Sequence, residues 1–166
     1  MKICLIIPPS PFLLDERVFV QLGILKIAAS LEQQNYSVDM IDLSGVENYI
    51  DVLNDYINTS TRASVFGITA TTPQVPYAVK IGQFLKNKMP GDVSKVILGG
   101  PHVTLMHTAA KREAAKNFVG SNRAHKDVEC LKQYFDVLVC GDGELAIFDA
   151  ITTNEKVIDA DNTKSE

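Results

Sequence analysis

The sequence predicts an α/β fold in which helices cover both faces of a parallel β-sheet. Two observations carry this prediction. Short runs rich in β-branched and apolar residues alternate along the chain with longer stretches in which apolar residues recur at helical spacing. Three of the short runs are almost continuously apolar, as strands are when helices bury both of their faces. The length of 166 residues suits one domain of this kind.

Five runs are expected to form the strands of the sheet. They are KICLII at 2–7, SVDMID at 37–42, SVFGIT at 64–69, KVILGG at 95–100 and DVLVCG at 136–141. Crossover connections between parallel strands are right-handed, so strands that alternate with helices predict a doubly wound, flavodoxin-like (Rossmann-like) sheet. We expect the strand order 2-1-3-4-5.

The stretches between these runs carry helical patterns, and at least five helices are expected. The apolar stripe of the first helix is expected to consist of Leu22, Leu25, Ala28, Ala29 and Leu31. Ser44 with Glu47 predicts a capping box at the start of the second helix. Thr72 followed by Pro73 predicts the N-cap and the first helical residue of the third.

The domain is expected to span residues 1–152. Within it, residues 103–126 make an unusually long and locally basic connection between the fourth and fifth strands. The remaining residues, 153–166, are polar and acidic, which is typical of a tail or an interdomain linker.

Composition argues against several classes of partner. The net charge of −4 and the lack of a dominant basic run argue against nucleic-acid binding. The apolar run at residues 3–7 is too short for a signal peptide or a membrane helix, so we expect a cytoplasmic protein with no membrane partner. Cys4, Cys130 and Cys140 do not have the spacing of metal ligands and are expected to be small buried hydrophobes with reduced thiols. No metal site is predicted.

Candidate binding residues directly follow the strands, because ligands of open α/β sheets bind beyond the carboxyl ends of the strands. Glycines there let a ligand approach the main chain, and hydroxyls and helix N-termini hold phosphate or amide groups. The alternative is that these glycines only form tight turns. The candidates are Pro9, Ser10, Thr69, Ala70, Thr71, Thr72, Gly99, Gly100, Pro101, His102, Gly141, Asp142, Gly143 and Glu144.

No residue is predicted to be catalytic. The chain has neither the G-x-x-x-x-G-K-[ST] phosphate loop nor the G-x-S-x-G elbow of serine hydrolases. Asp142 and Glu144 are interpreted as charges at a helix N-terminus. His102 is expected to be a loop histidine that hydrogen-bonds the backbone or a ligand, whereas His107 and His125 are expected at the surface.

Four of the post-strand motifs, taken in order, resemble a known family. They are Leu22-Gly23-Ile24, Gly67-Ile68-Thr69, Gly99-Gly100-Pro101-His102 and Gly141-Asp142-Gly143-Glu144. This set resembles the N-terminal cobalamin-binding domain of radical S-adenosylmethionine enzymes over about residues 1–152. The resemblance implies a corrin ring over the carboxyl edge of the sheet and a nucleotide tail buried beside it. Thr69 to Thr71 would be the hydroxyl-bearing loop of that family, and Gly99 and Gly100 its glycine pair.

The sequence departs from the wider family at two points. The D-x-H-x-x-G motif, whose histidine ligates cobalt from below, is replaced by PPSPFLLDERVF at 8–19, which implies cobalt without an imidazole from that loop. The C-x-x-x-C-x-x-C motif that binds the iron–sulfur cluster in the barrel domain is also missing from these residues. We therefore expect an excised domain, not catalytic by itself. Its parent would hold the cluster and S-adenosylmethionine in a covalently linked domain, and would catalyse methyl transfer or rearrangement at an unreactive carbon.

Two other functions remain open at this point. One is a flavodoxin-like interaction module with a vestigial pocket, in which residues 103–126 dock another domain. The other is a small enzyme acting on nucleotides or sugars, with Asp142 or Glu144 as the working acid. A bulky residue at Gly100 is expected to abolish cofactor uptake while sparing a protein partner.

Overall fold

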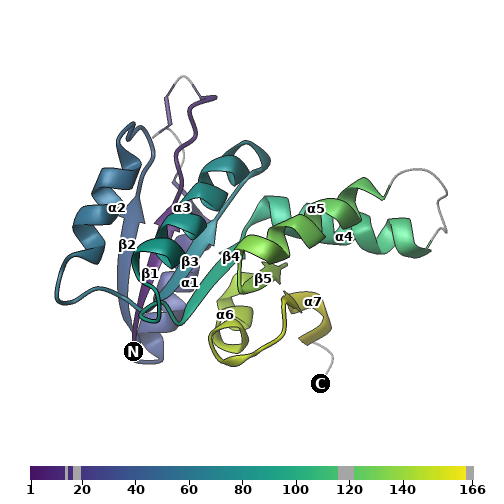
Figure 1. Ribbon diagram of the computed structural model, residues 1–166. Helices are drawn as coiled ribbons and strands as arrows, with labels where there is room; N and C mark the ends of the chain where they lie inside the picture. Colours follow the sequence, from purple (N-terminus) through teal and green to yellow (C-terminus); the bar gives the residue numbers. More distant parts are fainter. Residues whose placement is uncertain (14, 17–19, 116–121, 164–166) are drawn as a thin grey trace.

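A six-stranded parallel sheet forms the centre of the protein (Figure 1). The computed structural model describes residues 1–13, 15, 16, 20–115 and 122–163. The strands are β1 (Lys2–Ile7), β2 (Ser37–Asp42), β3 (Val65–Thr69), β4 (Lys95–Gly99), β5 (Val137–Cys140) and β6 (Val157–Asp159). Their order is β2-β1-β3-β4-β5-β6, and all neighbouring pairs are parallel. The predicted α/β class and the order of the first five strands are confirmed.

The prediction of five strands is wrong by one strand. β6 lies within residues 153–166, which were expected to form a tail or linker, and it pairs with β5 from Leu138↔Val157 to Cys140↔Asp159. It has only three residues, of which Ile158 is buried. A strand this short offers too little periodicity to stand out in a polar sequence, and it is defined by its pairing with β5.

Helices cover both faces of the sheet, as the doubly wound fold requires. They are α1 (Leu22–Gln33), α2 (Tyr49–Ile57), α3 (Val75–Lys88), α4 (Pro101–Ala115), α5 (Arg123–Tyr134), α6 (Gly143–Thr152) and the short α7 (Ala160–Thr163), with a 3-10 turn η1 (Thr72–Gln74) before α3. Side chains alternate along each strand. Ile3, Leu5 and Ile7 of β1 therefore pack with α1 and α6, whereas Cys4 and Ile6 pack in the cluster that includes α2, α3 and α5.

The buried stripe of α1 differs from the expected one. Ile24, Ala28 and Leu31 are buried, whereas Leu22 and Leu25 are 66% and 41% exposed. Leu22 is the first residue of the helix, which begins at the carboxyl edge of the sheet. The first turn of α1 therefore presents Leu22 outside the core.

Both predicted helix caps need correction. The capping box expected at residues 44–47 is wrong, because Asn48 is the N-cap of α2 and makes no side-chain capping bond. Before α3 the cap lies one residue earlier than expected. Thr71, not Thr72, is the N-cap of η1, and its backbone N–H donates a hydrogen bond of 3.0 Å to Oε1 of Gln74.

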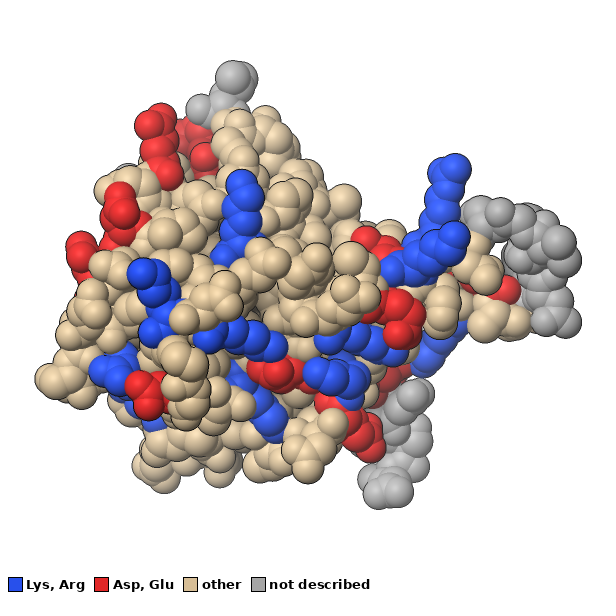
Figure 2. All heavy atoms as spheres, viewed as in Figure 1, with Lys and Arg blue, Asp and Glu red and all other residues tan. Residues whose placement is uncertain are grey.

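The long connection at 103–126 belongs mainly to a helical arm, defined here as α4 and α5. The two helices pack against each other and extend beyond the sheet (Figure 1). Residues 116–121 lie outside the described residues. Figure 2 shows acidic side chains gathered over α2, while basic and acidic side chains alternate over the rest of this face, the arm included. Among the described residues, no helix is both long and apolar enough to cross a membrane.

The three cysteines are not equivalent. Cys4 and Cys140 are buried as expected, but Cys130 is exposed on α5. Burial raises the pKa of the Cys4 and Cys140 thiols to about 12, which keeps them protonated and unreactive at neutral pH. We expect one thiol per chain to react with Ellman's reagent in the native protein and three in denaturant, with Cys130 carrying the native label by mass spectrometry. Rapid native labelling of Cys4 or Cys140 would contradict this.

Asp159 at the end of β6 links the last strand to α4. It accepts hydrogen bonds from Nζ of Lys111 and, at 3.3 Å, from Nε2 of His107. The bond from Lys111 holds the pKa of Asp159 below its ordinary value of 3.8. A carboxyl with a lowered folded-state pKa stabilises the fold above its unfolded pKa and loses that effect as the pH falls through the folded one.

We therefore expect Asp159→Asn to lower the free energy of unfolding by about 1 kcal/mol at neutral pH. The difference from wild type should shrink as the pH falls below 3.8, because the wild-type carboxyl is then protonated as well. Urea unfolding at several pH values between neutral and acid measures both the loss of unfolding free energy and its dependence on pH. A difference that grows in acid would show that the carboxylate does not stabilise the fold.

Candidate functional site

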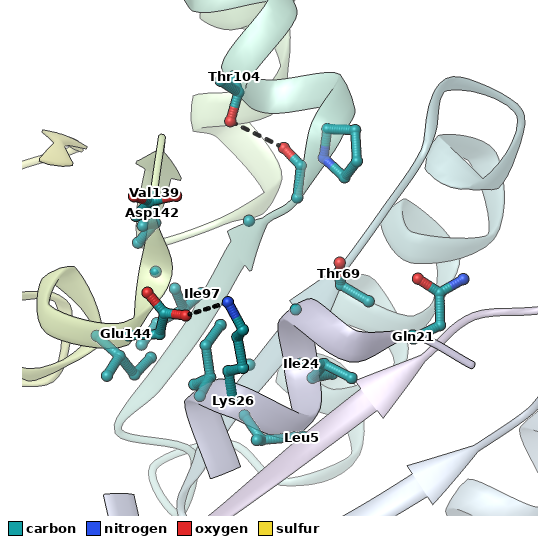
Figure 3. Close-up of a pocket in the computed structure, with 18 of the residues that line it drawn as sticks. Leu5, Gln21, Ile24, Lys26, Thr69, Ile97, Thr104, Val139, Asp142 and Glu144 are labelled. Atoms are coloured by element: carbon teal, nitrogen blue, oxygen red, sulfur yellow. Dashed lines mark hydrogen bonds and ion pairs between the residues drawn. The ribbon is translucent and has the colours of Figure 1, made fainter. Parts of the chain in front are cut away.

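A cavity of about 680 Å³ opens at the carboxyl edge of the sheet, between α1 and α6 (Figure 3). Its floor comes from β1, β3, β4 and β5, and its walls from the two helices. A volume of this size lies within the range of small-molecule and cofactor sites. Eight of the residues predicted from the strand ends therefore line a space large enough for a ligand.

Two glycines of the central strands lie in the floor of the cavity, but only Gly99 has open space above it, because a Cβ at Gly67 would lie 2.8 Å from Cδ2 of Leu5. Gly67 of β3 lies between Leu5 and Ile97 in the strand register, and Gly99 of β4 pairs with Thr69. A Cβ built at Gly99 would lie 3.7 Å from the backbone oxygen of Val139 and 3.8 Å from its Cβ, which are ordinary contacts. Gly99 therefore has room for a small side chain. Because glycine has none, this room is part of the cavity.

The walls of the cavity are aliphatic. Ile24 and Ile27 approach from α1, and Ile147 approaches from α6. α6 comes close to α1 because Gly143 has no side chain: a Cβ there would lie 2.7 Å from Cδ1 of Ile27. The glycine of the fifth post-strand loop thus sets the packing of the two walls.

Polar side chains lie at the mouth of the cavity. Lys26 of α1 and Glu144 of α6 form an ion pair of 3.2 Å between Nζ and Oε1, which joins the two walls (Figure 3). Gln21, just before α1, and Thr69, at the end of β3, also line the cavity. Glu144 lies in the first turn of α6, as expected for a helix N-terminal charge.

Gly100 serves the fold rather than the cavity volume. Its φ of +101° is a left-handed conformation that favours glycine. A Cβ there would lie 2.7 Å from Oγ1 of Thr69 and 2.8 Å from the backbone nitrogen of Ala70. Any side chain at Gly100 would therefore strain the turn itself. A bulky substitution, which we expected to separate cofactor uptake from partner binding, would disturb the fold instead.

Thr104 connects the loops that follow β4 and β5. Its Oγ1 donates a hydrogen bond of 3.2 Å to the carbonyl oxygen of Gly100 and accepts one of 3.0 Å from the N–H of Gly141. Together, these two hydrogen bonds fix the position of the loop after β4 relative to the loop after β5. No sequence motif pointed to Thr104, because its role depends on the start of α4 facing the loop after β5.

The structure divides the predicted site residues into two groups. Those that line the cavity are Thr69, Gly99, Gly100, Pro101, Gly141, Asp142, Gly143 and Glu144. Those that do not line it are Pro9, Ser10, Ala70, Thr71, Thr72 and His102. The glycine-bearing loops after β4 and β5 are therefore brought together, whereas the residues after β1 and most of the loop after β3 lie outside the cavity.

His102 is a helical residue and not the loop histidine we expected. It lies in the first turn of α4 and is buried, with Nδ1 3.1 Å from Oγ1 of Thr72 and Nε2 2.9 Å from Oδ2 of Asp127. These contacts join η1, α4 and α5. His102 therefore holds the helical arm against the domain. His107, expected at the surface, is partly buried and contacts Asp159.

Sequence reasoning missed the apolar lining of the cavity. These residues come from strand interiors and helix faces, not from the loops, and include Leu5, Ile27, Ile97, Val139, Leu105 and Ile147. The alternation of side chains along each strand was an available signal, since it places Leu5, Ile97 and Val139 on the same face as Gly67 and Gly99.

Comparison with models of known protein families matches residues 16–126 to the B12 binding domain. The matched segment runs from the loop before α1 into the start of α5 and includes both floor glycines, Gly67 and Gly99. The chain belongs to the B12-binding domain family. No curated protein and no solved structure matches the chain. In the part of the chain that the structure describes, no cluster of three or more His, Cys, Asp or Glu side chains could hold a metal ion.

Proposed function

We propose that this B12-binding domain holds cobalamin with the nucleotide tail in the cavity between α1 and α6 and the corrin ring across its mouth. The observation that carries the proposal is the hollow above Gly99, on one of the central strands. Central strands of a parallel sheet are normally covered by packed side chains. Gly99 leaves a space at this place that a flat, buried group would fill.

The residues around the cavity suit the parts of such a ligand. The aliphatic walls from Ile24, Ile27 and Ile147 fit an aromatic base. The hydroxyl of Thr69 and the side chain of Gln21 stand at the rim, where the polar linker of the tail would leave the cavity. Leu22 and Leu105 also line the cavity while being 66% and 60% exposed, so they offer apolar surface to a ring that covers the mouth.

Cobalamin supplies a cobalt centre that can carry a methyl group or generate a radical. The loop after β1 would lie beneath that centre, and it contains no histidine. Gln74 holds this loop in place, because its Nε2 donates a hydrogen bond of 2.9 Å to the carbonyl oxygen of Pro8. Pro9 and Ser10 are buried there. We propose that these residues shape the lower side of the site without ligating cobalt.

We further propose that the domain serves a radical S-adenosylmethionine enzyme that transfers a methyl group to, or rearranges, an unreactive carbon. The ordered loop motifs and the loop after β1 without a histidine support this parent class. The iron–sulfur cluster and S-adenosylmethionine would be held by a covalently linked domain. Sequencing the reading frame beyond Glu166 tests the assignment. A downstream C-x-x-x-C-x-x-C motif is expected, and a frame that continues into an unrelated domain would overturn it.

Cobalamin binding itself is tested with the purified chain. Incubation with hydroxocobalamin followed by desalting is expected to leave a coloured protein with about one corrinoid per chain, by its visible spectrum. Calorimetry with the same ligand then gives the dissociation constant. A colourless protein that also produces no heat of binding would overturn the proposed function for this chain.

A further inference from the structure

We propose that the cavity selects among complete corrinoids by their lower base, and prefers an apolar benzimidazole to a purine. This inference rests on the proposed function, because it assumes that the nucleotide tail enters the cavity between α1 and α6. It concerns the chemistry of the buried end of the tail. The preference follows from where the polar groups around the cavity lie.

The inner part of the cavity is lined by aliphatic side chains. Leu5, Ile97 and Val139 face it from the sheet, and Ile24 and Ile147 face it from the helices. All five are buried in the same apolar cluster. None of these side chains donates or accepts a hydrogen bond, so a base packed among them gains from apolar contact alone.

The main chain on the floor is already paired. β3 lies between β1 and β4, and β4 lies between β3 and β5. The register pairs Gly67 on both of its sides, with Leu5 and Ile97, and pairs Gly99 on the β3 side, with Thr69. At the end of the floor, the carbonyl oxygen of Gly99 accepts a hydrogen bond of 3.1 Å from the N–H of Ala70. A base lying over Gly67 and Gly99 would thus meet carbon atoms and paired peptide groups.

Among the polar side chains of the lining, Lys26, Glu144 and Thr104 have partners, and Thr69 lies next to Gly99 in the register of β3 and β4. Lys26 pairs with Glu144 across the mouth, and Oγ1 of Thr104 bonds to the loops of Gly100 and Gly141 (Figure 3). These groups can meet the ribose and phosphate of the tail. They are not placed beside a base that lies deep between the aliphatic walls.

A purine base that entered the cavity would therefore lose hydrogen bonds to water, and the aliphatic side chains around it would not replace them. Both bases carry the ring nitrogen that coordinates cobalt in the free cofactor, but adenine adds an exocyclic amine and further ring nitrogens. Each buried polar group left without a partner costs roughly 1–3 kcal/mol, which corresponds to about 10- to 100-fold in affinity. Benzimidazole has carbon and methyl groups at the corresponding places and loses nothing of this kind.

The test compares three corrinoids by calorimetry on the full chain. They are cobalamin, its analogue with adenine as the lower base, and cobinamide, which lacks the nucleotide. We expect cobalamin to bind at least tenfold more tightly than either of the others. Equal affinity for the first two would overturn the selection and leave the proposed function intact. Equal affinity for all three would overturn both the selection and the proposed place of the nucleotide tail, because the tail would then not use the cavity. No binding by any of them would overturn the proposed function itself.

A pair of substitutions on one strand locates the selection. Val139→Thr keeps the shape of the wall and adds a hydroxyl that a purine can bond and that benzimidazole leaves unpaired, so it should narrow the preference at least threefold. Val137→Thr is the matched control, because Val137 is buried on the same face of β5 but does not line the cavity. The ratio of the dissociation constants for the adenine analogue and cobalamin is the quantity to compare. If it is unchanged in the Val139 variant, or changes equally in the Val137 variant, the base does not lie beside Val139.

Discussion

Replacing Gly99 by leucine is expected to weaken cobalamin binding at least 100-fold while the domain stays folded. Gly99 has room for a Cβ, with its nearest neighbours at 3.7 Å and 3.8 Å, and its φ is not in the left-handed region. A leucine therefore fits the backbone but projects into the space that the ligand needs. Losing the buried contacts of an aromatic base removes several kcal/mol of binding free energy, which exceeds two orders of magnitude in affinity.

Calorimetry with hydroxocobalamin and thermal unfolding of the same samples measure the two effects. Gly99→Ala is the graded comparison, and it should bind more tightly than the leucine variant because it fills less of the hollow. Gly100→Ala is the contrasting control. It should lower the melting temperature strongly, since its Cβ meets backbone atoms of Ala70. Undiminished binding by a folded Gly99→Leu protein would place the ligand elsewhere.

Replacing His102 by alanine is expected to cost about 2–3 kcal/mol of unfolding free energy and to change the dissociation constant for cobalamin less than threefold. The side chain is buried and joins Thr72 of η1 to Asp127 of α5. Its removal leaves a void and two groups without their partner, and each of these destabilises the fold. His102 does not line the cavity, although its neighbour Pro101 does, because its side chain points to Thr72 and Asp127.

His125→Ala is the matched control, since His125 is exposed on the same arm. It should leave both the unfolding free energy and the binding unchanged. Urea unfolding and calorimetry on the two variants separate the effects. A His102 variant of normal stability that binds cobalamin tenfold more weakly would mean that His102 contacts the ligand, which is the role that its position after β4 first suggested.

The first five strands could be located from the sequence, including β2 at the edge of the sheet, whereas the three-residue β6 could not. KICLII and SVDMID have the same bounds as β1 and β2, because an apolar or β-branched run flanked by polar residues leaves little choice of register. β6 escaped notice because VID is three residues long and only its pairing with β5 makes it a strand. Its anchor, Asp159, depends on Lys111 in a helix far away along the chain.

The loops of the site were predictable, but the cavity was not. Gly99 is the last residue of β4 and Gly141 follows β5, and parallel topology brings the ends of strands to one edge. The sequence does not say which glycine opens space and which one fits a turn. Gly99 and Gly100 are adjacent, and only the backbone conformation and the neighbours of each Cβ distinguish their roles. The helical period left the apolar stripe of α1 ambiguous at its first turn, so Leu22 was assigned to the core.

The most direct test of where cobalamin binds is hydrogen exchange of the backbone amides with and without hydroxocobalamin. We expect slower exchange on binding in the first turns of α1 and α6, around Ile24 and Glu144, with α2 unchanged. Bound cobalamin that protects α2 and α3 while leaving α1 and α6 unchanged would contradict it.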